Sequence, residues 1–257
     1  MYQKLWKEKH ASVCSINFYG SSSSKILGLT GFIIENYIVT DEIIYQPRNN
    51  CQYVMISFFA QDGYHHTEDI IIDSDDFYRM VPKIEDFDNL GIAMIPTGDI
   101  DELKNIKPLE FCRNCHDSIG RAVTHIGYQF EENTLSFNQG MISSTYRTNN
   151  NLSYLMYNST IKAGMSGSPV LDLKTGLVVG VNTNRMLSIS KSYQDIIKTV
   201  DQNLEILKNV EEVIDEKASI DTTQVLFATQ NQLKQIARKF MTAMALKTGY
   251  ALEISQV

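Results

Sequence analysis

The stretch Gly164-Met165-Ser166-Gly167-Ser168-Pro169 is the most specific signal in this sequence of 257 residues. A serine in the pattern Gly-x-Ser-Gly can sit on a sharp turn that aims backbone N–H groups at one point, where an oxyanion would form. The small residues let a substrate backbone approach closely. The stretch therefore predicts either a nucleophile loop or an ordinary glycine turn between two strands. In a nucleophile loop, Ser166 is the nucleophile, and Gly164, Met165 and Ser166 supply the oxyanion hole.

Short β-rich segments surround this stretch over most of the first 183 residues. They alternate apolar and polar side chains or form brief apolar runs, and turn residues separate them. Such spacing is typical of a sandwich or a barrel. The predicted strands are Ser12–Phe18, Gly31–Thr40 (with a turn at its Asn), Tyr53–Phe59, Leu90–Ile95, Ala122–Ile126, Gly140–Ser144, Tyr154–Thr160, Ser168–Leu171, Leu177–Asn182 and, at the end of the chain, Gly249–Ile254.

Between the last two of these strands the apolar period changes to that of a helix. The spacing predicts two amphipathic helices, over about residues 192–217 and 229–247, joined around Ser219 to Phe227. About sixty residues lie between Thr183 and Gly249, far more than a usual connection. Two interpretations stay open: a helical hairpin packed on the adjacent barrel, or an element that binds a partner or covers a cleft.

The order of these segments resembles that of the trypsin-like serine peptidases, most closely the Deg/HtrA-type group. The resemblance covers about three quarters of the chain. It rests on the nucleophile stretch and on Gly28–Ile34, Tyr37–Thr40, Asn89–Ile95, Ile126–Tyr128, Gln139–Ser144, Leu177–Thr183 and Gly249–Ile254, in the family's order.

The resemblance implies a mainly β fold of two Greek-key barrels with a cleft between them and a helical insertion before the last strand. The expected domains are an N-terminal barrel over residues 1–110, a C-terminal barrel over 111–183 plus 248–257, and the insertion over 184–247.

The chain departs from the family where the other catalytic groups belong. After Tyr-Ile-Val-Thr the family has two variable residues and then the catalytic histidine, and this position is Ile43. The position of the catalytic carboxylate falls on Asn89. An isoleucine accepts no proton, so Ser166 loses its general base. Asp41 and Glu42 lie beside the missing histidine, where a carboxylate is a weak base only if burial raises its pKa.

The five histidines of the chain are the other groups that could replace the base. They are His10, His65, His66, His116 and His125, and each is read as a surface or strand histidine. The function expected from these residues is a catalytically inactive serine-peptidase homologue that binds a polypeptide or a partner protein. The alternative is an active trypsin-like endopeptidase with Ser166 as nucleophile and a non-standard base.

The bulk composition narrows the class of protein further. The net charge of −7 argues against binding of nucleic acid, and no run of about 18 apolar residues predicts a membrane span. Neither the pair Cys112 and Cys115, read as unpaired thiols in a turn, nor the acidic residues of 73–88 have the spacing of a metal site. We therefore expect no metal and no cofactor. The first ten residues contain no apolar run of a signal peptide, and the four cysteines do not suggest a disulfide framework, so we expect a cytoplasmic location. The sequence does not give the oligomeric state, and the helical insertion is the surface through which an oligomer would form.

Overall fold

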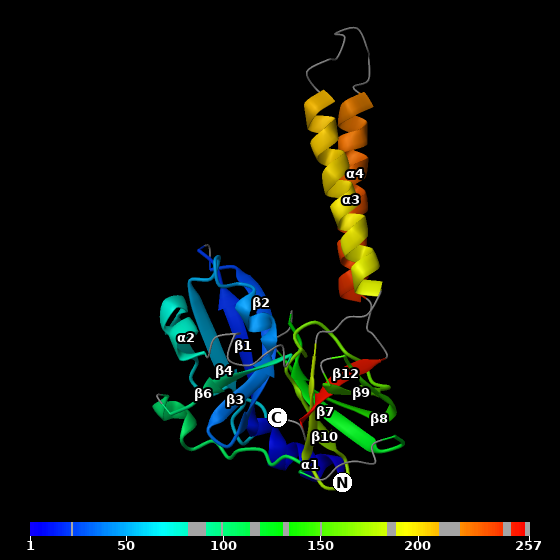
Figure 1. Ribbon diagram of the computed structural model, residues 1–257. Helices are drawn as coiled ribbons and strands as arrows, with labels where there is room; N and C mark the ends of the chain where they lie inside the picture. Colours follow the sequence, from blue (N-terminus) through cyan, green and yellow to red (C-terminus); the bar gives the residue numbers. More distant parts are fainter. Residues whose placement is uncertain are drawn as a thin grey trace. The chain divides into compact units, whose positions relative to one another are not determined.

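The computed structural model describes residues 1–21, 23–81, 91–98, 100–113, 119–130, 134–149, 151–183, 189–210, 222–243 and 248–254. Within them the chain divides into two compact units (Figure 1). The first unit comprises Met1–Asn184 with Leu246–Val257, and the second comprises Arg185–Ala245. No helix in the described ranges is both long and apolar enough to cross a membrane.

Six antiparallel strands at the start of the first unit form a curled half-barrel. Their order in the sheet is β5-β4-β1-β2-β3-β6. Alternate side chains of β1, Cys14, Ile16 and Phe18, are buried in its core, as the period of two predicts. The strands are β1 (Val13–Tyr19), β2 (Lys25–Ile34), β3 (Tyr37–Asp41), β4 (Tyr53–Phe58), β5 (Ile70–Asp73) and β6 (Ile92–Pro96).

The remaining six strands close into a barrel in the order β10-β11-β12-β9-β8-β7. The last strand of the chain lies between β11 and β9, so the segments before and after the second unit pair directly. The strands are β7 (Ala122–Tyr128), β8 (Leu135–Arg147), β9 (Ser153–Tyr157), β10 (Pro169–Asp172), β11 (Val178–Asn182) and β12 (Gly249–Glu253). The predicted mainly β fold is thus confirmed, and its first half is a curled half-barrel.

A shared apolar cluster holds the half-barrel against the closed barrel. Val13, Phe32 and Val39 of the half-barrel pack in it with Tyr128 and Val181 of the closed barrel, and all five are buried. The segment that joins the two also pairs with both: Leu109 donates its amide to Ile33, and Cys112 donates to Val178. These contacts fix the half-barrel relative to the closed barrel, so that residues of both can contribute to one site.

Short helices, which the sequence pattern did not reveal, complete the first unit. They are α1 (Tyr2–Lys9), the 3-10 turn η1 (His10–Ser12), the turn η2 (Glu42–Tyr45), α2 (Ser74–Met80) and the turn η4 (Asp101–Leu103). The Asp73 side chain accepts a hydrogen bond from the Asp75 amide and caps α2. Part of the acidic run between 73 and 88 thus begins a helix.

The second unit consists of two helices, α3 (Ile189–Val210) and α4 (Thr222–Ala243). Val200 of α3 and Ala237 of α4 are its buried apolar residues in the described part. Helices were predicted here, but residues 222–227 were assigned to the connection, and this is wrong because they form the first turns of α4. Neither Gly nor Pro interrupts 222–243, so the helix extends toward its N-terminus past the apolar residues that were counted.

Candidate functional site

The stretch 164–169 forms a loop that leads into β10, and glycines define its shape. Gly164 and Gly167 have φ angles of +92° and +84°, in the region that glycine adopts without steric cost. A Cβ on Gly164 would lie under 3.0 Å from the backbone of Tyr128 and Phe130. Residues other than glycine would therefore strain the loop at both positions.

Asn182, the last residue of β11, holds this loop from one side. Its carbonyl accepts the amide of Gly167 (2.7 Å), and its own amide donates to Ser168 (2.8 Å). Its side-chain amide donates to the carbonyl of Met165 at 2.9 Å, and its side-chain oxygen accepts the hydroxyl of Tyr157 at 3.2 Å. Asn182 is buried, so these bonds are shielded from water.

Thr30 of β2 holds the loop from the half-barrel. Its amide donates to the carbonyl of Ser166 at 2.9 Å, and its hydroxyl donates to the carbonyl of Gly164 at 2.8 Å. The same hydroxyl accepts the amide of Tyr128 at 2.9 Å. Thr30 thereby links the loop to both halves of the first unit and fixes the backbone on either side of Met165.

The hydroxyl of Ser166 is hydrogen-bonded to a carboxylate. Ser166 Oγ donates to Asp41 Oδ2 at 2.6 Å, and the two residues are only 9% and 4% exposed. Asp41 ends β3, and its Oδ1 accepts the amide of Ile43 at 2.8 Å, which caps the turn η2. This short contact between two buried groups fixes the direction of the Ser166 hydroxyl.

The three amides predicted for the oxyanion hole differ in their partners. The amide of Met165 donates to the carbonyl of Lys162 at 3.2 Å, inside the loop itself. The amides of Gly164 and Ser166 have no acceptor in the described part of the chain. Two amides of the loop, on either side of Met165, thus lack an acceptor among the described residues.

Ile43, the position of the missing histidine, lies in η2 and packs against the apolar core of the half-barrel. Glu42, beside it, is exposed. Asn89, the position of the missing carboxylate, lies outside the described residues. The structure thus joins Ser166 to Asp41 and gives Ile43 a packing role.

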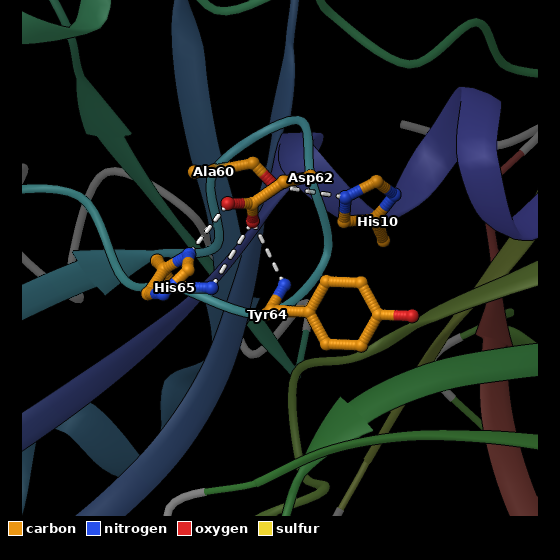
Figure 2. A network of polar contacts seen from close by, with 5 residues as sticks. All are labelled: His10, Ala60, Asp62, Tyr64 and His65. Atoms are coloured by element: carbon orange, nitrogen blue, oxygen red, sulfur yellow. Dashed lines mark hydrogen bonds and ion pairs between the residues drawn. The ribbon is translucent and has the colours of Figure 1, made fainter.

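The histidines that the structure describes are engaged elsewhere. Figure 2 shows His10 near Ala60 and His65 beside Asp62. The ring nitrogens of His10 lie 2.8 Å from the carbonyl of Trp6 and 3.0 Å from that of Ala60. His65 Nδ1 lies 2.6 Å from Asp62 and holds the pKa of that carboxyl below its usual range. His116 lies outside the described residues.

His125 and His66 complete this set. The ring of His66 packs on Phe59 with centroids 4.3 Å apart. His125 of β7 is fully buried, with Nε2 3.1 Å from Ser159 Oγ and its ring against Tyr157. Burial lowers the pKa of His125 to about 4. None of the described histidines contacts Ser166, and the nearest charged partner of the hydroxyl is Asp41.

The buried His125 predicts a loss of stability in acid. Its ordinary pKa is 6.5, so the unfolded chain takes up a proton below that pH, while the folded chain resists protonation until about pH 4. The stability contributed by the neutral ring is complete above pH 6.5 and is lost as the pH falls toward 4, by roughly 3 kcal/mol in total. Urea unfolding between pH 7 and pH 4.5 should show this decline, and His125→Gln should make it shallower. An equally steep decline in His125→Gln would contradict the assignment.

The acidic and cysteine residues of the first unit form no metal site in the described part of the chain. Within the described ranges, no three His, Cys, Asp or Glu side chains lie together in a way that could hold a metal ion. The expectation of an unpaired thiol at Cys112 is wrong, because Cys112 is disulfide-bonded. Sequence spacing gives only the chain distance between two thiols, whereas pairing depends on the local backbone. Cys14 and Cys51 are free.

Comparisons with known proteins agree with this architecture. Residues 30–181, more than half of the chain, match the family model described as a trypsin-like peptidase domain. Similar solved structures include the HtrA-type protease AlgW with a tripeptide (TM-score 0.51, 17% identity) and Deg5 (0.53, 16%). A third is the serine endoprotease from Yersinia pestis (0.50, 18%).

Each of these comparisons covers 71% of this chain, and they cover 54%, 84% and 57% of the other chains, respectively. The chain therefore spans about half the length of AlgW. At these identities the likeness extends to the fold, a closed six-strand barrel beside a curled half-barrel as in chymotrypsin-like proteins. No curated protein sequence matches the chain.

Proposed function

This chain belongs to the trypsin-like peptidase domain family, and from that premise we propose that it is a catalytically inactive member that binds a polypeptide. The observation that carries the proposal is the partner of the Ser166 hydroxyl. In a working triad this hydroxyl donates to an imidazole, which takes its proton. Here it donates to the Asp41 carboxylate at 2.6 Å.

A carboxylate is a poor replacement for the imidazole. The ordinary pKa values of Asp and His differ by about 2.6 units, so proton transfer to a carboxylate is less favourable by about 3.5 kcal/mol. Both oxygens of Asp41 already accept hydrogen bonds, one from the Ser166 hydroxyl and the other from the Ile43 amide. The pair therefore holds the serine in place and activates it little.

Binding of an extended polypeptide is supported by the free donors of the loop. The amides of Gly164 and Ser166 lack acceptors among the described residues, and a peptide carbonyl is the oxygen that such a pair of donors suits. The related AlgW was solved with a tripeptide, and AlgWS227A was solved with a decapeptide. We propose the same class of ligand for this chain, held without cleavage.

One observation favours a second function, that of a weakly active serine endopeptidase. Ser166 Oγ and Asp41 Oδ2 lie within the distance that a nucleophile and its base need. In that case Asp41 is the non-standard base. Asp41→Asn separates the two functions, because asparagine keeps an acceptor for the hydroxyl but takes no proton.

Binding can be tested with fluorescein-labelled β-casein in a fluorescence-anisotropy titration. We expect saturable binding, with the casein intact by mass spectrometry. Ala163→Trp, at an exposed position next to Gly164, should weaken binding at least tenfold by filling the approach to the loop. The matched control is Ala122→Trp. Ala122 is also exposed, but it begins β7, whereas Tyr128, the β7 residue beside Gly164, ends it about 20 Å further along the strand.

Absence of binding, or equal loss in both tryptophan variants, would contradict binding at this loop. Cleavage of the casein that Asp41→Asn abolishes would favour the second function instead.

A further inference from the structure

Helix α4 carries exposed apolar side chains on the face that α3 does not cover. Val225, Leu226, Leu233 and Ile236 are 52%, 49%, 43% and 50% exposed. Such exposure is unusual for four aliphatic side chains within a dozen residues. We call Leu226, Thr229, Leu233 and Ile236, with Val225 beside them, the α4 stripe.

The side chains of α4 that face α3 include both apolar and polar residues. The buried residues of the described hairpin are the apolar Val200 and Ala237. The polar pairs beside them are only partly buried: the side-chain amide of Asn203 in α3 donates to Gln230 at 3.5 Å, and Lys234 pairs with Asp201. The apolar side chains of the α4 stripe are left exposed, and an exposed apolar face of this kind marks a site of interaction.

The spacing of the α4 stripe is that of a coiled-coil seam. Leu226, Thr229, Leu233 and Ile236 follow one another at intervals of three, four and three residues, which are the a and d positions of a heptad. The hydroxyl of Thr229 donates to the carbonyl of Val225 at 2.8 Å. Covering Thr229 therefore leaves no unpaired hydroxyl in the contact.

We propose that the α4 stripe binds the same stripe of a second copy of this chain, with the two α4 helices antiparallel. In this pairing Leu226 lies opposite Ile236 of the second copy, and Thr229 lies opposite its Leu233. Every layer then contains a large aliphatic side chain, and a two-fold axis relates the copies. A parallel pairing would place Thr229 opposite Thr229 and would align the helix dipoles unfavourably.

The charges along α4 favour a second copy over a charged partner. The residues that flank the seam, Val225, Gln230, Gln232 and Ala237, are uncharged. Lys234 is the one charged residue between 225 and 237, and it pairs with Asp201 on the α3 side. Two copies therefore meet without like charges in contact. A charged partner, by contrast, would meet no residue of opposite charge along this seam. The proposal is independent of peptide binding by the first unit.

Sedimentation of the full chain between 1 and 100 µM tests the proposal. We expect a dimer of twice 29.2 kDa that dissociates on dilution. Leu233→Asp and Ile236→Asp should each raise the dimer dissociation constant at least 100-fold. The control is Ile206→Asp, which changes a more exposed isoleucine of α3 outside the stripe and should leave the constant within threefold. Circular dichroism of each variant checks that the helices persist.

Cysteine cross-linking tests the antiparallel arrangement. An oxidised mixture of Thr229→Cys and Leu233→Cys chains should give more cross-linked dimer than either variant alone, with unmodified protein as the blank for Cys14 and Cys51. A monomer at every concentration, or a dimer that Leu233→Asp leaves unchanged, would overturn the proposal. The proposal would also be overturned if the protein is a monomer and Leu233→Asp and Ile236→Asp lower its melting temperature while Ile206→Asp does not. The stripe would then pack against its own chain.

Discussion

Purified protein is expected to leave casein and mixed peptide libraries uncleaved above background. General-base assistance supplies about 10²–10⁴-fold in rate, and a complete triad supplies more. Ile43 cannot accept a proton. Asp41 accepts the hydrogen bond of the Ser166 hydroxyl, but a carboxylate is ordinarily a weaker base than an imidazole. A fluorophosphonate probe should therefore label Ser166 at a rate at least 100-fold below that of an active trypsin-like peptidase assayed in parallel.

Reintroducing the missing groups is the informative counterpart of this test. Ile43→His alone should recover little, because Asn89 leaves the imidazole without its orienting carboxylate. The hydrogen bond from Ser166 to Asp41 would also compete with the new histidine. We therefore expect the largest recovery from Ile43→His combined with Asn89→Asp and Asp41→Asn, and its loss when Ser166→Ala is added. Robust cleavage by the unmodified protein, abolished by Ser166→Ala, would overturn the inactive assignment.

Gly167→Ala is expected to destabilise the first unit by about 2–5 kcal/mol. Alanine at a φ of +84° costs about 1–2 kcal/mol. In addition, its Cβ would lie under 3.0 Å from Thr30 O, Thr40 Oγ1 and Asp41 N. Two of these are backbone atoms of paired strands and cannot move aside as a side-chain end can, so overpacking adds about 1–3 kcal/mol. Urea unfolding measures the change.

Gly120→Ala is the matched control for this substitution. Gly120 has the same φ of +84°, but a Cβ there meets nothing within 4 Å in the described part of the molecule. It should therefore cost only the conformational part, about 1–2 kcal/mol. If Gly167→Ala fails to accumulate as folded protein while Gly120→Ala does, the expectation is met. Equal costs for the two variants would show that the contacts around Gly167 relax freely.

The strands around the nucleophile loop could be read from the sequence because they are short β-rich runs separated by turn residues. In β1, for example, the apolar residues Cys14, Ile16 and Phe18 stand at every second position of the sequence and pack in the same core. The shorter elements could not be read in this way. The strand β5 has only four residues, and its three consecutive isoleucines carry no alternation. For α4, the apolar spacing predicted a helix but not which apolar residues its partner covers.

The sequence by itself determined the fold class, the loop of Ser166 and the absence of a histidine at position 43. These features depend on local patterns and on residue identity, which the chain carries without reference to its folding. Only the tertiary structure decided that Asp41, 125 residues away, receives the hydroxyl of Ser166, and that Thr30 and Asn182 hold the loop. Such contacts join distant segments, and their geometry arises only when the strands of both halves pack around the shared core.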